Sequence, residues 1–172
     1  MQLPLASIFG LAALASQASA HGLVTKPDAR TPGAATAAAC GETMAKFYQA
    51  DNTSYPEALM RANPGGLKDG YDPAKCNLYL CRGYQFADNK DHVQEYMTGE
   101  VVDMEVFIRI PHKGYANVSI VDTTTNTVIG EPLLSWPDNY AATNTPPKDQ
   151  TSFNVTIPEL DGKCAEAGVC VR

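Results

Sequence analysis

The feature that most constrains the fold is a set of segments in which apolar and polar residues alternate. From residue 102 to residue 110 every second residue is a large apolar one, and three of the four residues between them are charged. Residues 116–120 and 153–157 repeat the pattern, and 22–24 and 127–129 are shorter candidates. A period of two is typical of strands with one buried face. Separated by Gly, Pro and Asn turns, these strands predict a mainly β protein, an antiparallel β-sandwich.

Helical signals are confined to one stretch. Residues 34–50 are rich in Ala and place Met44, Phe47 and Tyr48 at near-helical spacing, which predicts one short helix. Residues 51–75 carry many Pro, Gly, Asn and Asp residues and read as a long loop, with a single helical turn at 57–61. Long ordered loops often carry function.

The first twenty residues read as a secretory leader. An apolar core from Leu3 to Leu14 is followed by Ala18-Ser19-Ala20, an A-x-A-like cleavage site. No Lys or Arg precedes Lys26, so only the terminal amine supplies positive charge. The alternative, a membrane anchor, is disfavoured because the apolar stretch is too short to span a bilayer. We therefore expect a signal peptide at 1–20 and a single secreted, extracellular domain at 21–172.

Charge and glycosylation motifs agree with export. The chain has 13 Lys and Arg against 19 Asp and Glu, a net charge of −6, which argues against nucleic acid and anionic membranes as partners and suits a monomer acting on an uncharged substrate. Three N-x-[ST] sequons make candidate glycosylation sites, at Asn52, Asn117 and Asn154.

The number of cysteines is odd. In an oxidising compartment they should pair, and one is left over among Cys40, Cys76, Cys81, Cys164 and Cys170. Several arrangements of two bridges are possible. A Cys164–Cys170 bridge is favoured because a short loop closes easily.

His21 is the sharpest chemical feature, because cleavage after Ala20 would make it the first residue. A terminal histidine offers its amine and its ring Nδ1 to one metal ion, and nitrogen donors of this kind favour Cu(II). The alternative is that the mature chain begins with His by coincidence.

Two other histidines could complete a metal site. His112 falls between two strongly alternating segments, at a strand end where binding residues gather. His92 lies in the polar run ADNKDHVQEY, which is typical of a solvated loop. We expect His112 to be the second ligand; the alternative is an ordinary surface histidine beside Lys113.

Three segments together resemble a fungal lytic polysaccharide monooxygenase. They are HGLVTKPDARTPGAATAAACGE, CNLYLCRGYQFADN and IRIPHKGYANVSIVD. The similarity is to auxiliary activity family sixteen, whose members are often labelled chitin-binding type-4-like, and it covers residues 21–170. The resemblance implies an immunoglobulin-like sandwich and a histidine brace, in which His21 binds one copper ion through its amine and Nδ1 and His112 binds through Nε2. It also implies oxidative cleavage of polysaccharide, with cellulose and C1 oxidation expected, driven by an external electron donor and O2 or peroxide.

The chain departs from the family at its C-terminal end. Relatives continue past the cysteine equivalent to Cys170 into an aromatic-rich strand that supplies the axial copper residue, and then a further cysteine. The sequence here stops at Arg172, which we interpret as a C-terminal truncation that also explains the odd cysteine.

Two alternatives remain from other classes. One is a secreted protein that binds carbohydrate or copper without turnover. The other is a structural secreted protein with an incidental histidine. The choice between cellulose, chitin and another glycan, the regioselectivity and the substrate-binding residues are left open.

Overall fold

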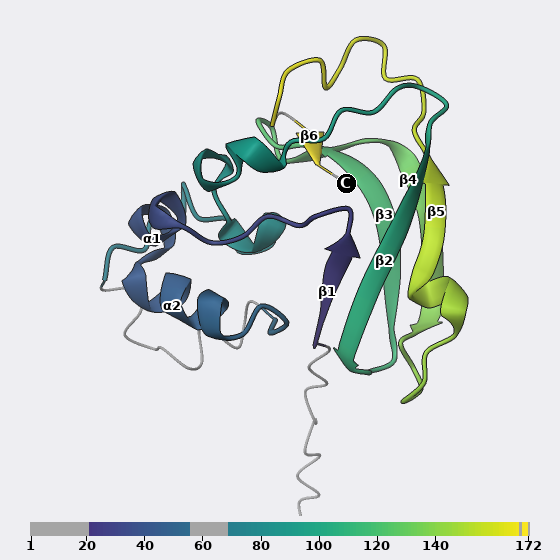
Figure 1. The fold of residues 1–172 in the computed structure, drawn as a ribbon, viewed down its shortest axis with the longest axis horizontal. Coiled ribbons are helices and arrows are strands. Elements are labelled where there is room, and N and C mark those ends of the chain that lie inside the picture. Colours follow the sequence, from purple (N-terminus) through teal and green to yellow (C-terminus); the bar gives the residue numbers. More distant parts are fainter. Residues whose placement is uncertain (1–20, 56–68, 169, 172) are drawn as a thin grey trace, which may run out of the picture.

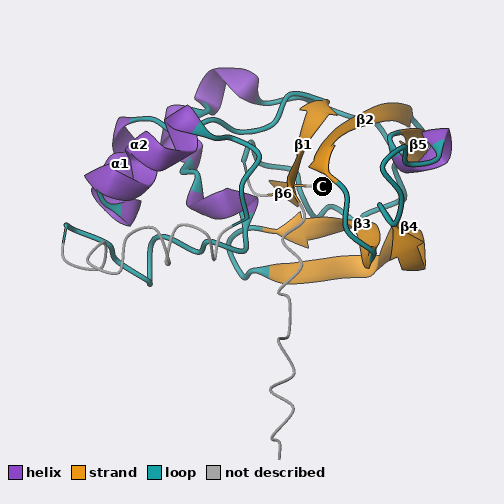
Figure 2. Ribbon diagram, turned by 90° about the horizontal axis from the view of Figure 1, so that it is seen from below, coloured by secondary structure: helices purple, strands orange, loops and turns teal. Residues whose placement is uncertain are grey.

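Two antiparallel sheets of three strands each form the core of the computed structural model, which describes residues 21–55, 69–168, 170 and 171. The first sheet has the order β1-β2-β5, with β1 at His21–Lys26, β2 at Val101–Ile110 and β5 at Ser152–Thr156. The second has the order β4-β3-β6, with β3 at Gly114–Asp122, β4 at Thr127–Tyr140 and β6 at Cys170–Val171. Figure 2 shows the sheets as two layers with the helices beside them. The predicted mainly β sandwich is therefore confirmed.

The alternating segments form strands because their apolar faces meet between the sheets. This core contains Val102 and Met104 of β2, Val118 of β3, and Val155 and Ile157 at β5. The polar positions between them face outward, and the sequon residues Asn117 and Asn154 are both exposed. The alternation no longer predicts burial at the end of β2, where Ile110 is exposed although it continues the apolar series.

The strand predicted at 127–129 is far longer in the structure. β4 runs for 14 residues and contains Pro132 and Pro137. Proline cannot donate a backbone hydrogen bond, so it is tolerated on an edge strand. β4 is the edge of its sheet, which explains why the sequence pattern missed it.

The single helix predicted at 34–50 is two helices. α1 spans Ala34–Cys40 and α2 spans Glu42–Ala50, and they are separated by Gly41. Gly41 has a φ of +89°, and a Cβ there would lie 2.1 Å from an Asp69 carboxylate oxygen. Only glycine adopts this conformation without strain, so the break depends on it. The helical turn predicted at 57–61 lies outside the described residues.

A second apolar cluster, under the helices, is formed by residues of α1, α2 and the loop that follows residue 69. These elements lie beside the sandwich (Figure 1). The cluster includes the Cys40–Cys76 disulfide. That loop continues through three short 3-10 helices at Cys81–Gly83, Phe86–Asp88 and Lys90–His92; a fourth, Lys148–Gln150, precedes β5. The large members of the apolar cluster under the helices are Met44, Tyr48, Leu78 and Tyr84. The helices and this loop form a helical layer with an apolar core of its own, separate from the core between the sheets.

The second disulfide joins Cys164 to Cys170, the pairing favoured from the sequence. Cys81 is the cysteine left with a free thiol. Burial raises the pKa of that thiol, and the nearby Arg30 partly opposes the shift. β6 begins at Cys170, the second cysteine of this disulfide. It pairs Cys170 with Asp122 and Val171 with Val121 of β3.

Candidate metal centre

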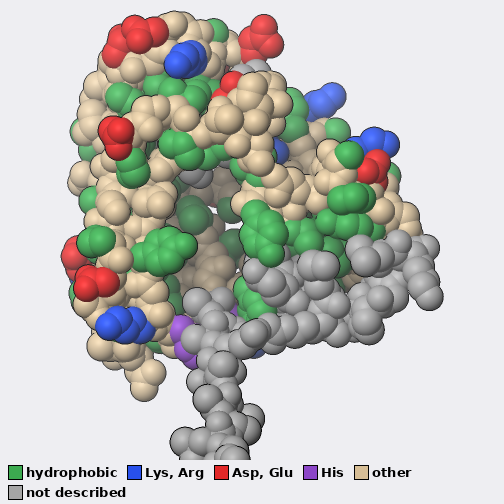
Figure 3. Space-filling model, turned by 180° about the vertical axis from the view of Figure 1, so that it is seen from behind, with side chains coloured by type: hydrophobic (Ala, Val, Ile, Leu, Met, Phe, Trp, Pro, Cys, Tyr) green, Lys and Arg blue, Asp and Glu red, His purple; other side chains and the backbone are tan. Residues whose placement is uncertain are grey.

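His21 and His112 lie at the same end of the first sheet. His21 is the first residue of β1, and its antiparallel partner is Ile110, the last residue of β2. His112 follows Ile110 after one intervening proline. β1 therefore begins where β2 ends (Figure 1), and histidine atoms appear at this end of the surface in Figure 3. The register thus places His21 at the end of the sheet where β2 stops, two residues before His112 in the sequence.

The Nδ1 atom of His21 is buried and has no hydrogen-bond partner in the described part of the chain. The edge of its ring contacts Tyr55, with ring centroids 5.4 Å apart and planes at 81°. Buried polar atoms in native proteins are nearly always satisfied, and an exception calls for an explanation such as an ion. A metal ion bound to Nδ1 would supply the missing partner, so this nitrogen fits a copper ligand.

At Gly22, the residue after His21, β1 approaches β2 closely. A Cβ on Gly22 would lie 3.0 Å from the backbone oxygen of Phe107, tighter than ordinary contacts. The Gly22 N–H also donates to Thr53 O at 3.1 Å. The backbone beside the candidate ligand is thus held from two sides.

The strand register is irregular at the candidate site. His21 pairs with Ile110 but Gly22 pairs with Ile108, so Arg109 of β2 has no partner residue on β1. Bulges of this kind are frequent next to functional sites, where they redirect side chains. The Arg109 guanidinium Nη1 donates to Asp51 Oδ1 at 3.2 Å and to Thr53 Oγ1 at 3.1 Å.

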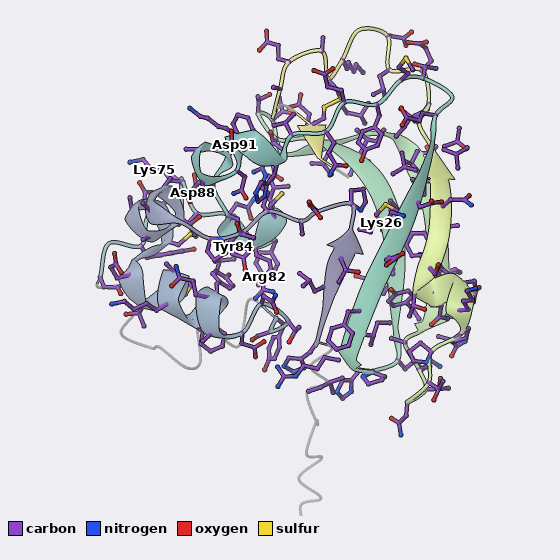
Figure 4. The ribbon with its side chains drawn as sticks, viewed as in Figure 1. Lys26, Lys75, Arg82, Tyr84, Asp88 and Asp91 are labelled. Atoms are coloured by element: carbon purple, nitrogen blue, oxygen red, sulfur yellow. A yellow bond between two sulfur atoms is a disulfide. The ribbon has the colours of Figure 1, made fainter. Side chains whose placement is uncertain are left out.

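His92 lies elsewhere. It ends an exposed 3-10 helix, and its N–H donates to Asn89 O. Figure 4 labels its neighbour Asp91, which lies towards the Lys26 end of β1, opposite the end where β1 begins. Along β1, His92 therefore lies towards the end opposite His21, and the choice of His112 as second ligand stays a prediction.

The turn at residues 51–54 was not singled out as part of a site from the sequence. Thr53 and Ser54 are buried, and the Thr53 N–H and Oγ1 donate to Asp51 Oδ1 at 3.0 and 2.8 Å. Burial alone would raise the pKa of Asp51, but the hydrogen bonds that its carboxylate accepts from Thr53, together with the Arg109 charge, hold this pKa well below its usual range. Only the Asn52 sequon marked this turn, and Asn52 is exposed.

Within residues 21–55, 69–168, 170 and 171, no three His, Cys, Asp or Glu side chains come together as metal ligands. A site made from two imidazoles and an amine has only two such side chains, so this finding does not bear on it. No helix among the described residues is long and apolar enough to cross a membrane. The sequence matches no protein-family model, and no curated protein matches it significantly.

Proposed function

We propose that residues 21–172 form a secreted, copper-dependent enzyme that cleaves polysaccharide oxidatively. The observation that supports this most is the position of His21. It begins β1 opposite Ile110, which lies two residues before His112 in the sequence, and its Nδ1 is buried with no hydrogen-bond partner among the described residues. The resemblance of these segments to lytic polysaccharide monooxygenases suggests the activity.

The residues of the chain would form the brace as follows. Cleavage after Ala20 frees the His21 amine, so that the amine and Nδ1 act as a chelate and the His112 ring contributes a third nitrogen. Cu(II) is the divalent ion that such a nitrogen set binds most tightly. When bound, copper would supply the one-electron chemistry, with an external electron donor and O2 or peroxide, that removes hydrogen from a glycosidic carbon.

The surface around His112 suits an uncharged polymer. Tyr115, three residues after His112 in the sequence, is 79% exposed. Exposed aromatic rings provide a flat apolar surface that a sugar ring can cover, and the net charge of −6 offers no attraction for anionic polymers. Cellulose is the substrate we expect first, and chitin is the second.

Copper titration of the chain that begins at His21 tests the metal site. We expect one Cu(II) per chain, with the electron paramagnetic resonance (EPR) signal of nitrogen ligands. The His112→Ala variant should lose this signal and the His92→Ala variant should keep it, because His92 lies towards the end of β1 opposite His21. Loss of the site in the His92 variant alone would contradict the assignment.

An added methionine before His21 provides the matched control for the chelate. It converts the amine into a peptide nitrogen, a far poorer ligand, so copper affinity should fall by a factor on the order of 10–100. Equal affinity would show that the terminus is not a ligand. Oxidised sugar release from cellulose and from chitin, with copper and a reductant, then separates the enzyme from a protein that only binds copper or glycan.

A further inference from the structure

The turn at Asp51–Ser54 connects the candidate metal ligand to the rest of the molecule. It accepts the Gly22 N–H at Thr53 O, and Tyr55, the residue that follows the turn, contacts the His21 ring. The first two residues of β1 therefore depend on where this turn lies. Two arginines hold the turn, and they come from different parts of the fold.

Arg109 holds the turn from the sandwich. It occupies the irregular position of β2 opposite the step from His21 to Gly22. One of its nitrogens donates to both Asp51 Oδ1 and Thr53 Oγ1. The Thr53 hydroxyl donates in turn to Asp51 Oδ1, so the three side chains form a closed set of hydrogen bonds. These hydrogen bonds thus connect the end of β2 to the turn, at the β2 residue next to the partner of His21.

Arg82 holds the turn from the helical layer (Figure 4). Its guanidinium donates to the backbone oxygens of Asp51, at 3.3 Å, and of Asn52. The same group lies over the ring of Tyr48, 4.7 Å from its centroid, and 5.7 Å from the Tyr84 centroid. Both tyrosines belong to the buried cluster under the helices. A cation between aromatic rings keeps one orientation, since stacking and hydrogen bonds act together.

We propose that Arg82 and Arg109 are positioning residues that orient the amine and ring of His21 through the Asp51–Ser54 turn. Neither guanidinium needs to touch the metal. Each fixes one side of the turn, and the turn fixes the first peptide of β1 through Thr53 O. The expected effect on copper binding rests on the proposed function. The expected effect on the position of β1 does not.

The first measurement needs no copper. We would compare the amide exchange of Gly22 by NMR in the chain beginning at His21 and in the variants Arg82→Gln and Arg109→Gln. Both variants should exchange at least about threefold faster, because the acceptor Thr53 O is no longer held in place. Arg30→Gln is the matched control: Arg30 also donates to a backbone oxygen, Tyr84 O, and lies over an aromatic ring, Phe86, but has no bond to the turn. Unchanged exchange in both variants would overturn the proposal.

The second measurement uses Cu(II) as the probe. We expect both variants to bind copper about tenfold more weakly, with altered EPR parameters, as for other residues that orient metal ligands. Arg82→Lys should not restore the affinity, since one ammonium group cannot reproduce the two backbone bonds. Affinity and spectrum identical to wild type in both glutamine variants would contradict the positioning role.

Two further outcomes keep the proposals apart. If the chain beginning at His21 binds no copper but Gly22 exchange still rises in both variants, the proposed function fails and the role of the arginines in fixing β1 stands. If Arg82→Gln does not fold, Arg109→Gln decides, because the Arg109 side chain is 52% exposed and lies outside both apolar clusters.

Discussion

At the scale of single residues, Gly22 is a position where an added side chain would disturb the candidate site. A Cβ there would meet the Phe107 backbone oxygen at 3.0 Å, and a backbone atom of a paired strand cannot easily move away. We expect Gly22→Ala to displace the start of β1 by a few tenths of an ångström and to weaken Cu(II) binding about tenfold. Isothermal titration of the chain beginning at His21 measures this change.

Gly114 supplies the control for that substitution. It opens β3 close to His112, but the nearest atom to a Cβ there is 3.9 Å away. Gly114→Ala should therefore leave copper affinity unchanged. Equal losses in the two variants would show that crowding against Phe107 is not what matters.

At the scale of elements, the start of α1 depends on Asp88 rather than on a residue of its own. The Asp88 carboxylate accepts hydrogen bonds from the N–H groups of Gly33, Ala35 and Thr36 and from the Thr36 hydroxyl, at 2.7–3.1 Å. Burial alone would raise its pKa, but these hydrogen bonds outweigh burial and lower it. The start of α1 is therefore stabilised by a residue distant in the sequence, since Asp88 ends a 3-10 helix and lies 52 residues after Thr36.

The substitution Asp88→Asn should reduce the free energy of unfolding by about 1–3 kcal/mol at pH 7, the cost of losing hydrogen bonds to a charged group. Because the folded pKa lies below the unfolded value of about 3.9, this contribution is complete above that pH. It disappears as the pH falls through the lowered pKa. Urea unfolding of wild type and variant between pH 7 and pH 2 should therefore show a difference that shrinks in acid.

Asp91→Asn is the control for this pH dependence. Asp91 is exposed in the neighbouring 3-10 helix and lies close to Asp88 in the fold (Figure 4). Its substitution should change the free energy of unfolding little at any pH. A difference between wild type and Asp88→Asn that stays constant from pH 7 to pH 2 would rule out the carboxylate charge as the cause.

At the scale of the whole molecule, the two disulfides constrain very different lengths of chain. Cys40–Cys76 closes a separation of 36 residues and lies in the cluster under the helices, whereas Cys164–Cys170 closes 6 residues. Loop-closure entropy predicts that replacing both cysteines of a pair by alanine costs about 4 kcal/mol for the long loop and about 2 kcal/mol for the short one. Guanidinium unfolding of the two double variants compares them directly. A larger loss from the short loop would contradict this account.

The sequence by itself determined the alternating strands and suggested the two candidate ligands. β2, β3 and β5 alternate apolar and polar side chains, and that pattern is local, so it needs no knowledge of the fold. His21 and His112 were chosen on equally local grounds, a terminal chelate and a strand end. Local pattern failed where a single residue overruled it, as with Gly41 between the helices and the prolines of β4.

Only the tertiary structure decided how the candidate site is supported. Arg109 is one of the charged residues that alternate with apolar ones along a strand, and Arg82 lies in the segment CNLYLCRGYQFADN, where no residue pattern marks it as a contact of the turn. Their shared target, the turn that begins at Asp51, is 31 residues from Arg82 and 58 from Arg109 along the chain. Such contacts depend on strand register and on the packing of the helical layer against the sandwich. These are properties of the folded chain, and no periodicity of the sequence encodes them.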